Sequence, residues 1–218
     1  MTVGGDFEPG DRRADRAVLL AHGAGAGRNA APLVATAGAL AGAGIPSLRF
    51  DFPYRAAGRK APDRPPVLLQ AVRDAAADLA ARTGLGPDRL VLGGRSMGGR
   101  YCSLAVGDAE DPLPALGLLL LGYPLHPAGR PESLRVEHFP RLSVPVLFLS
   151  GDRDALAGKA ELEKWAGTIP GPVTFHWLAG ADHGYRVPKS LGGPGEAAVM
   201  AEVARRSTEW VASLAPRP

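Results

Sequence analysis

The residues of this chain that could carry out acyl-transfer chemistry begin with a serine among glycines, in the segment GGRSMGGR at 93–100. Gly94, Ser96 and Gly98 have the spacing G-x-S-x-G, in which the serine stands on a sharp turn between a strand and a helix. Side chains two residues before and after the serine would collide across such a turn, so both positions must be small. The following helix points its N-terminus at the reaction centre, where the N–H of Met97 can donate to a developing oxyanion. The pattern predicts Ser96 as a nucleophile, although alone it also fits a glycine-rich turn with an incidental serine.

A second glycine-rich segment, AHGAGAG at 21–27, follows an aliphatic run near the N-terminus. An oxyanion hole needs a second N–H from a loop that can approach the substrate, and a loop of this kind after an early strand supplies it. We predict Ala24 as that donor, with Gly25 as the alternative. A dinucleotide or phosphate loop is the competing interpretation, but the glycines lack the G-x-G-x-x-G spacing. His22 is expected to hold the loop rather than to transfer protons.

Two carboxylates compete to be the acid that orients a catalytic histidine, both within LFLSGDRDAL at 147–156. Asp152 directly ends an apolar run, whereas Asp154 comes two residues later and can reach round the end of a strand. Such an acid accepts a hydrogen bond from the histidine and stabilises its protonated form. We favour Asp154, and expect Asp152 to fix the loop by bonding nearby backbone, but the sequence leaves the choice open.

The histidine must lie on an exposed loop beside the serine, and AGADHGY at 179–185 provides one. We predict His183 as the general base. His126 and His138 fall between the serine and the acid, outside the chain order Ser, Asp, His, and His176 lies inside an expected strand.

These segments lie far apart in the chain and need a scaffold that brings them together. Short runs that are apolar on successive residues indicate strands buried on both faces of a parallel sheet; they are 17–23, 47–52, 89–94, 115–123, 144–152 and 173–182. Helical patterns lie between them, at 30–43, 66–82, 97–106, 158–166 and 195–214. This alternation predicts an α/β fold, a mostly parallel twisted sheet with helices on both faces. The polar segment before Arg16 is expected to be an edge strand or a loose arm.

Ligands of open parallel sheets bind beyond the carboxyl ends of the strands, so the serine, acid and histidine should meet at one edge. Long loops at 51–66 and 123–140 would border this site. No insertion between Tyr123 and Pro140 is long enough to form a helical cap domain. The residues that we expect to contact substrate are Gly23, Gly25, Tyr54, Arg95 and His126. Arg95, with Arg55 and Arg59, could attract an anionic group of the substrate, although solvated surface charges are the competing interpretation.

The overall composition narrows the class of protein. The chain has 218 residues and a formal net charge of +3, and its basic residues are scattered rather than clustered as on a nucleic-acid surface. The single cysteine, Cys102, excludes an intramolecular disulfide, and no Cys/His spacing suggests zinc. No apolar run resembles a signal peptide or reaches the roughly 18 residues of a membrane span. We expect one domain over 1–218, in the cytoplasm, acting on a small molecule without metal, organic cofactor, nucleic acid or membrane. The oligomeric state is left open.

Taken together, the motifs resemble the α/β-hydrolase fold over nearly the whole chain. The segments AHGAGAG, LRFDFPY, GGRSMGGR, LLGYPLHPAGRPESLR, FLSGDRDAL and GADHGY resemble the small, lidless branch related to dienelactone hydrolases, many of whose members have no known substrate. The resemblance implies Ser96 as nucleophile, His183 as base and Asp154 as acid. Dienelactone hydrolases carry cysteine where this chain has Ser96, so their substrate is not transferred; Cys102 is expected to be a buried packing residue.

The expected reaction is hydrolysis of an ester or a similar acyl bond through an acyl-enzyme. Haloalkane dehalogenation is disfavoured because it needs an aspartate in the place of Ser96. Two alternatives remain open. The similar branch includes subunits of chromatin complexes, so the chain could be an interaction protein with an idle triad, or it could transfer the acyl group to an acceptor other than water.

Overall fold

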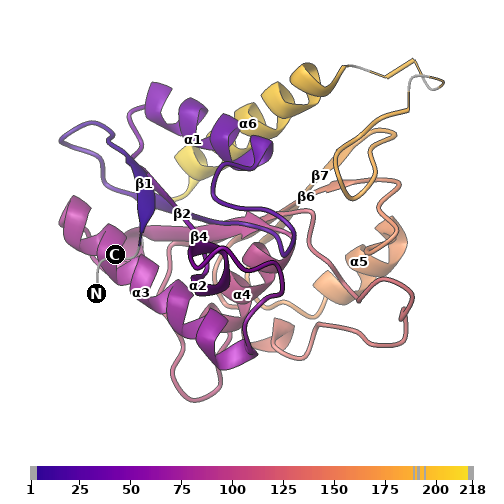
Figure 1. Ribbon diagram of the computed structural model, residues 1–218, viewed down its shortest axis with the longest axis horizontal. Coiled ribbons are helices and arrows are strands. Elements are labelled where there is room, and N and C mark those ends of the chain that lie inside the picture. The colour runs from indigo at the N-terminus through magenta and orange to yellow at the C-terminus, as the bar shows by residue number, and fades with distance from the viewer. Residues whose placement is uncertain (1–3, 189, 191, 194, 216–218) are drawn as a thin grey trace.

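The computed structural model describes residues 4–188, 190, 192, 193 and 195–215, which are built around a seven-stranded sheet (Figure 1). The strand order is β1-β3-β2-β4-β5-β6-β7. The strands are β1 (Gly5–Glu8), β2 (Ala17–Ala21), β3 (Ser47–Phe50), β4 (Leu90–Arg95), β5 (Gly117–Leu121), β6 (Val146–Gly151) and β7 (Val173–Leu178). Neighbouring strands are parallel, except that β1 runs antiparallel to β3. The predicted α/β fold with a mostly parallel sheet is confirmed.

Burial explains why the aliphatic runs form the centre of the sheet. Every residue of β2, β3, β4, β5 and β6 is buried, as expected for strands covered by helices on both faces. Strand β7 lies at one edge and is only partly buried. The polar N-terminal segment forms the other edge, where Gly5 pairs with Phe50. Of the two expectations for this segment, the edge strand is therefore correct.

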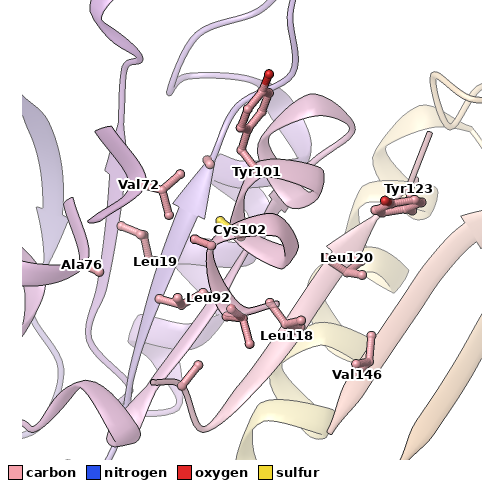
Figure 2. Packing of buried hydrophobic residues seen from close by; sticks show 14 of the residues in the cluster. Leu19, Val72, Ala76, Leu92, Tyr101, Cys102, Leu118, Leu120, Tyr123 and Val146 are labelled. Carbon is pink, nitrogen blue, oxygen red and sulfur yellow. The ribbon is translucent and has the colours of Figure 1, made fainter. Parts of the chain in front are cut away.

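The helices cover both faces of the sheet. They are α1 (Ala31–Gly42), α2 (Pro53–Ala56), α3 (Pro65–Thr83), α4 (Met97–Val106), α5 (Lys159–Ala166) and α6 (Glu196–Ser213). Helices α1 and α6 pack together over one face, around the buried residues Leu33, Leu40 and Val203. Helices α3, α4 and α5 cover the other face. Figure 2 shows part of that core, with Leu19, Val72, Leu92, Tyr101, Cys102, Leu118 and Tyr123 among its members.

The two long loops differ from each other in local structure. Residues 51–66 were expected to be irregular, yet they begin with the short helix α2, in which Phe52 O accepts bonds from the N–H groups of Arg55 and Ala56. Proline at the first helical position favours this turn, because it has no N–H to leave unpaired. Residues 123–140 stay irregular until a 3₁₀ turn at Phe139–Arg141.

Within the described ranges, no cap domain is inserted over the sheet. The same residues include no helix that combines the length and the apolar character required to cross a bilayer.

Candidate active site

The turn between β4 and α4 holds Ser96 in a conformation that few residues adopt. Ser96 has φ 51° and ψ −115°, a positive φ that costs a side chain other than glycine about 1–3 kcal/mol. The β2 strand passes so close that a Cβ at Gly94 or Gly98 would overlap the carbonyl oxygen of Ala21. Both glycines of the G-x-S-x-G pattern are therefore required by this close approach. The turn lifts the serine hydroxyl off the end of the sheet.

A continuous chain of hydrogen bonds links the serine to a histidine and a carboxylate. Ser96 Oγ lies 2.9 Å from His183 Nε2, and His183 Nδ1 lies 2.7 Å from Asp154 Oδ2. An ionised carboxylate can only accept, so His183 Nδ1 carries the proton and Nε2 is left to accept one from the serine. The side chain of Asp154 is fully buried, and that of His183 is 25% exposed. The structure thus brings together the three residues predicted as nucleophile, base and acid.

The competing carboxylate, Asp152, is turned away from the histidine. Its Oδ1 accepts the N–H of Gly180, 2.8 Å away, and so ties the end of β6 to the loop that follows β7. Asp154 is held by the N–H of Leu156, which donates to its Oδ1 at 2.8 Å. The choice that the sequence left open therefore has a geometric answer: Asp154 reaches His183, and Asp152 fixes the loop.

Two residues beside His183, Asp182 and Tyr185, shape its loop, and neither was predicted to have a role. Asp182 Oδ1 accepts the N–H groups of Gly184 and Arg186, at 2.7 and 2.9 Å. Tyr185 has φ 64°, and its buried hydroxyl donates to Leu149 O at 2.7 Å. An aspartate directly before the histidine is a known turn former, so that signal was present in the sequence. The positive φ of a tyrosine was not readable from it.

The loop after β2 is fastened close to the serine. A Cβ at Gly23 would lie 3.6 Å from Ser96 Cβ. His22 is buried; its Nε2 accepts the N–H of Phe52 at 3.1 Å, so its Nδ1–H donates to Gly23 O at 2.7 Å. Burial lowers the pKa of His22, which keeps the imidazole neutral in this role. His22 therefore holds the loop, as expected from the sequence.

The two predicted oxyanion donors are available. Ala24 and Met97 border one cleft together with Ser96. Over the part of the chain that the structure describes, the N–H groups of Ala24 and Met97 donate to no backbone carbonyl. Gly25, the alternative donor, is exposed, with open space beside it.

Two residues expected to contact substrate lie behind the site instead. Tyr54 is fully buried, and its hydroxyl donates to Ala24 O at 2.7 Å. Arg95 is buried as well; its guanidinium donates to the carbonyls of Leu121 and Gly122, both at 3.2 Å, and lies 4.6 Å from the centre of the Tyr185 ring. These contacts correct the expectation: Tyr54 supports the loop after β2, and Arg95 braces the elbow against the loop of His183.

The remaining histidines stand apart from the reaction centre. His126 is buried, and its Nδ1 is 2.9 Å from Pro127 O, so it supports the loop at 123–140 and does not border the cleft. His176 lies on β7 beside Glu202, at 3.2 Å. His138 lies 2.8 Å from Ser103 Oγ in the interior.

The cleft beside Ser96 has a volume of about 350 Å³. Helix α4 contributes Met97, Arg100 and Tyr101 to it; the two long loops contribute Pro62, Asp63, Pro124, Pro127, Ala128 and Arg135. Arg55 and Arg59, which were expected to attract an anionic group, are not among its lining residues, and Arg59 forms an ion pair with Asp63 at 2.7 Å. Arg100 and Arg135 were missed, although Arg100 follows Ser96 by one helical turn.

Cys102 lies in the interior and does not line the cleft beside Ser96. Cys102 is buried in α4, where burial raises the pKa of its thiol to about 12, and its Sγ donates to Gly93 O at 3.3 Å. It is the packing residue that the sequence predicted. Throughout the described ranges, His, Cys, Asp and Glu side chains form no group of three or more that could hold a metal ion.

Comparison with known proteins places this geometry in a wider context. A family model described as an alpha/beta hydrolase domain matches residues 14–212. A solved alpha-beta serine hydrolase homologue from Coxiella burnetii has a TM-score of 0.68 and 15% identity, over 96% of this chain and 97% of that one. Dienelactone hydrolase from Anabaena variabilis has a TM-score of 0.69 and 20% identity, over 96% and 91%. Est1E from Butyrivibrio proteoclasticus has 0.67 and 15%, over 95% and 93%. At these identities the likeness shows a shared fold.

Proposed function

The chain belongs to the alpha/beta hydrolase family, and on that premise we propose that it cleaves an ester or a similar acyl bond of a small molecule through Ser96, His183 and Asp154. The observation that carries the proposal is the unbroken chain of hydrogen bonds from Ser96 Oγ through His183 to Asp154. Esterases and a serine hydrolase homologue among the similar structures support a hydrolase. The proposal treats residues 1–218 as one domain, in keeping with a family match over 14–212.

The first half of the reaction forms an acyl-enzyme. Ser96 Oγ attacks the substrate carbonyl while His183 Nε2 takes its proton, and Asp154 stabilises the imidazolium that results. The carbonyl oxygen becomes an oxyanion and accepts the N–H groups of Met97 and Ala24. One such donor contributes about 10²–10³-fold to kcat in well-studied hydrolases. His183 then returns the proton to the leaving alcohol or amine.

The second half regenerates the enzyme. Water takes the place of the leaving group, His183 removes a proton from it, and the new hydroxide attacks the acyl carbon. The second tetrahedral intermediate collapses to free acid and releases Ser96, to which His183 gives back the proton. No organic cofactor takes part in this scheme.

Covalent labelling with a fluorophosphonate tests the proposal, since such probes react with activated serines. Intact mass and peptide mapping should find one adduct, on Ser96. Labelling should disappear in Ser96→Ala and become much slower in Asp154→Asn and His183→Ala. Ser103→Ala is the matched control, because it removes a serine from the same helix that also contacts a histidine. A folded wild-type protein that stays unlabelled would instead favour the interaction protein with an idle triad.

A further inference from the structure

Two arginines that border the cleft beside Ser96 have no carboxylate partner within the part of the chain that the structure describes. Arg100 and Arg135 both line this cleft. Among the residues that the structure describes, neither forms an ion pair, and the guanidinium of neither makes a hydrogen bond. Other arginines of the described residues do have a carboxylate partner, as Arg59 has in Asp63 and Arg73 in Asp108.

Helix α4 starts directly after Ser96 and fixes the position of Arg100 relative to this serine. Arg100 follows Ser96 by four positions, and its N–H donates to Ser96 O at 3.0 Å. Residues four apart lie on the same face of a helix, about one 5.4 Å turn from each other. The guanidinium is 5.4 Å from the centre of the Tyr101 ring, and its Nε is buried without a hydrogen-bond partner. A buried charged N–H without a partner is costly, so a ligand that accepted from it would relieve that cost.

Two hydrogen bonds hold the backbone of Arg135 in place. Its N–H donates to Leu125 O at 2.9 Å, and its carbonyl accepts the hydroxyl of Tyr123 at 2.6 Å. Tyr123 is fully buried. The loop at 123–140 is therefore anchored at the position that faces the cleft. Burial, and next the nearby charge of Arg100, lower the pKa of Arg135, which means that the two cations are close enough to repel each other.

We propose that Arg100 and Arg135 form a subsite for a carboxylate or phosphate group of the substrate. This inference rests on the proposed function, and it names the substrate class: esters that carry a compact anion a few bonds from the scissile carbonyl. Guanidinium groups bind oxyanions through paired, charge-assisted hydrogen bonds. An anion between these two arginines replaces their mutual repulsion with two attractions, and it orients the ester over Ser96.

One carboxylate, Asp63, shares the cleft with the two arginines, and its Oδ2 is buried without a hydrogen-bond partner among the described residues. Asp63 contributes to the lining, but its Oδ1 pairs with Arg59 at 2.7 Å, and it comes from the loop at 51–66 rather than from α4. Among the described residues, no ion pair joins Asp63 to Arg100 or to Arg135. The cleft thus retains two cations that Asp63 leaves unpaired.

Matched esters test the subsite and show where the anion belongs. Monoethyl glutarate and ethyl pentanoate differ only by a carboxylate on the acyl side. 4-Acetoxybutanoate and butyl acetate differ in the same way on the alcohol side, and 3-acetoxypropyl phosphate replaces the carboxylate with phosphate. For at least one of these pairs, kcat/KM for the anionic ester should exceed that for the neutral ester by about tenfold or more.

Variants assign that preference to the two arginines. In Arg100→Met and Arg135→Met, the ratio of kcat/KM for the anionic and neutral esters should fall by about 10–100-fold. Arg100→Lys should restore part of it. Arg141→Met is the matched control, because Arg141 borders a different pocket and already donates to Gly107 O. A labelled, active enzyme with no preference for any anionic ester overturns the subsite, as does a preference that survives in the double variant.

Binding separates failure of the subsite from failure of the proposed function. If Ser96 is not labelled by the fluorophosphonate, the proposed hydrolysis fails, and the thermal unfolding midpoint then decides the subsite. Glutarate or inorganic phosphate should raise the midpoint of the wild-type protein and should not raise that of the double variant Arg100→Met/Arg135→Met. An equal rise in both proteins, or no rise in either, overturns the subsite.

Discussion

Two serine–histidine pairs lie along helix α4, one at the residue that directly precedes the helix and one inside it. Their hydrogen-bond distances are nearly equal, but their surroundings differ. Ser96 Oγ is 2.9 Å from His183 Nε2 at the start of the helix, and Ser103 Oγ is 2.8 Å from His138 Nε2 seven residues later. The first pair stands at the edge of the sheet, where the His183 side chain is 25% exposed. The second is sealed in the interior, with His138 1% exposed. Distance alone does not distinguish a nucleophile from a structural contact.

The two pairs differ in which residue donates the hydrogen bond between serine and histidine. Ser103 has a single hydroxyl proton, and it donates this proton to Arg100 O at 2.8 Å. His138 Nε2 must therefore be the donor toward Ser103, which is the opposite of what a general base does. In the other pair, Asp154 takes the Nδ1 proton of His183 and leaves Nε2 free to accept from Ser96.

The environment of the histidine separates them further. Burial, and then the charges of Arg100 and Arg141, lower the pKa of His138 to about 3. Its Nδ1 has no hydrogen-bond partner among the described residues. A histidine that resists protonation this strongly cannot serve as a proton acceptor near neutral pH. The proposed catalytic role needs a carboxylate that orients the histidine and a histidine open to solvent, and only the first of these two pairs has both.

The largest expected difference between the pairs is in catalysis. Ser96→Ala should lower kcat/KM for an ester by about 10⁴-fold or more, because the reacting atom is lost. Ser103→Ala should stay within about threefold of the wild type. It should lose about 1–3 kcal/mol of stability, because it removes the bond to Arg100 O and leaves the buried N–H of His138 Nε2 without an acceptor. Steady-state kinetics and urea unfolding of both variants check this. Comparable activity losses in the two variants would contradict the distinction drawn here.

The carboxylate is the next feature to test, with its neighbour as the control. Asp154→Asn should lower kcat by about 10³–10⁴-fold, since an amide can donate to His183 Nδ1 and so favour the wrong tautomer. Asp152→Asn keeps an oxygen that can accept the N–H of Gly180, so its kcat should change by less than about fivefold. If Asp152→Asn proved the more damaging of the two, Asp154 would lose its role as the acid.

Unfolding at acidic pH tests whether His138, the histidine of the interior pair, is held neutral in the folded protein. The pKa of His138 in the folded protein is about 3, below its ordinary value of 6.5, so between these pH values the unfolded chain binds the additional proton. The free energy of unfolding therefore falls as the pH drops through this window, by about 2–3 kcal/mol from this group between pH 6.5 and 4.5. Between pH 6.5 and 4.5, the free energy of unfolding of His138→Gln should therefore fall by about 2–3 kcal/mol less than that of the wild type.

Urea unfolding at pH 6.5, 5.5 and 4.5 measures the effect. The pKa values of His22 and His176 are also lowered by burial, but they contribute equally to the wild type and the variant. Parallel stability profiles for the two proteins would mean that His138 is not held neutral in the folded state.

Much of this architecture could be predicted from the sequence, because its signals are local. Runs of aliphatic residues mark strands that are covered on both faces, and Ser96, Asp154 and His183 each follow such a run. Helix α2 was missed because its four residues are too few to show a period. The exact end of a strand depends on where its hydrogen bonds to the neighbouring strand stop. Residues distant in the sequence determine this, so the local sequence does not predict it.

The substrate-contacting residues were harder, and two arginines show why. Arg95 adjoins Ser96 in the sequence, but it is the last residue of a strand, and its side chain packs back onto Leu121, Gly122 and Tyr185. Arg100 is farther along the chain, yet the helical repeat returns it to the side of Ser96. Proximity in sequence is a poor guide at a strand-to-helix turn, because the direction of side chains changes there.

The smallest expected effect concerns the loop after β2, which lies beside Ser96. Tyr54 donates to Ala24 O at 2.7 Å and so sets the orientation of the peptide beside the proposed oxyanion donor. Tyr54→Phe keeps the ring and removes this bond, so kcat should fall by about tenfold, a fraction of the 10²–10³-fold cost of losing a whole donor. KM should change little, because the oxyanion exists only in the transition state. Boronic acids that form a tetrahedral adduct with Ser96 should weaken by the same factor as kcat, and unchanged inhibition with a reduced kcat would place the role of Tyr54 outside the oxyanion site.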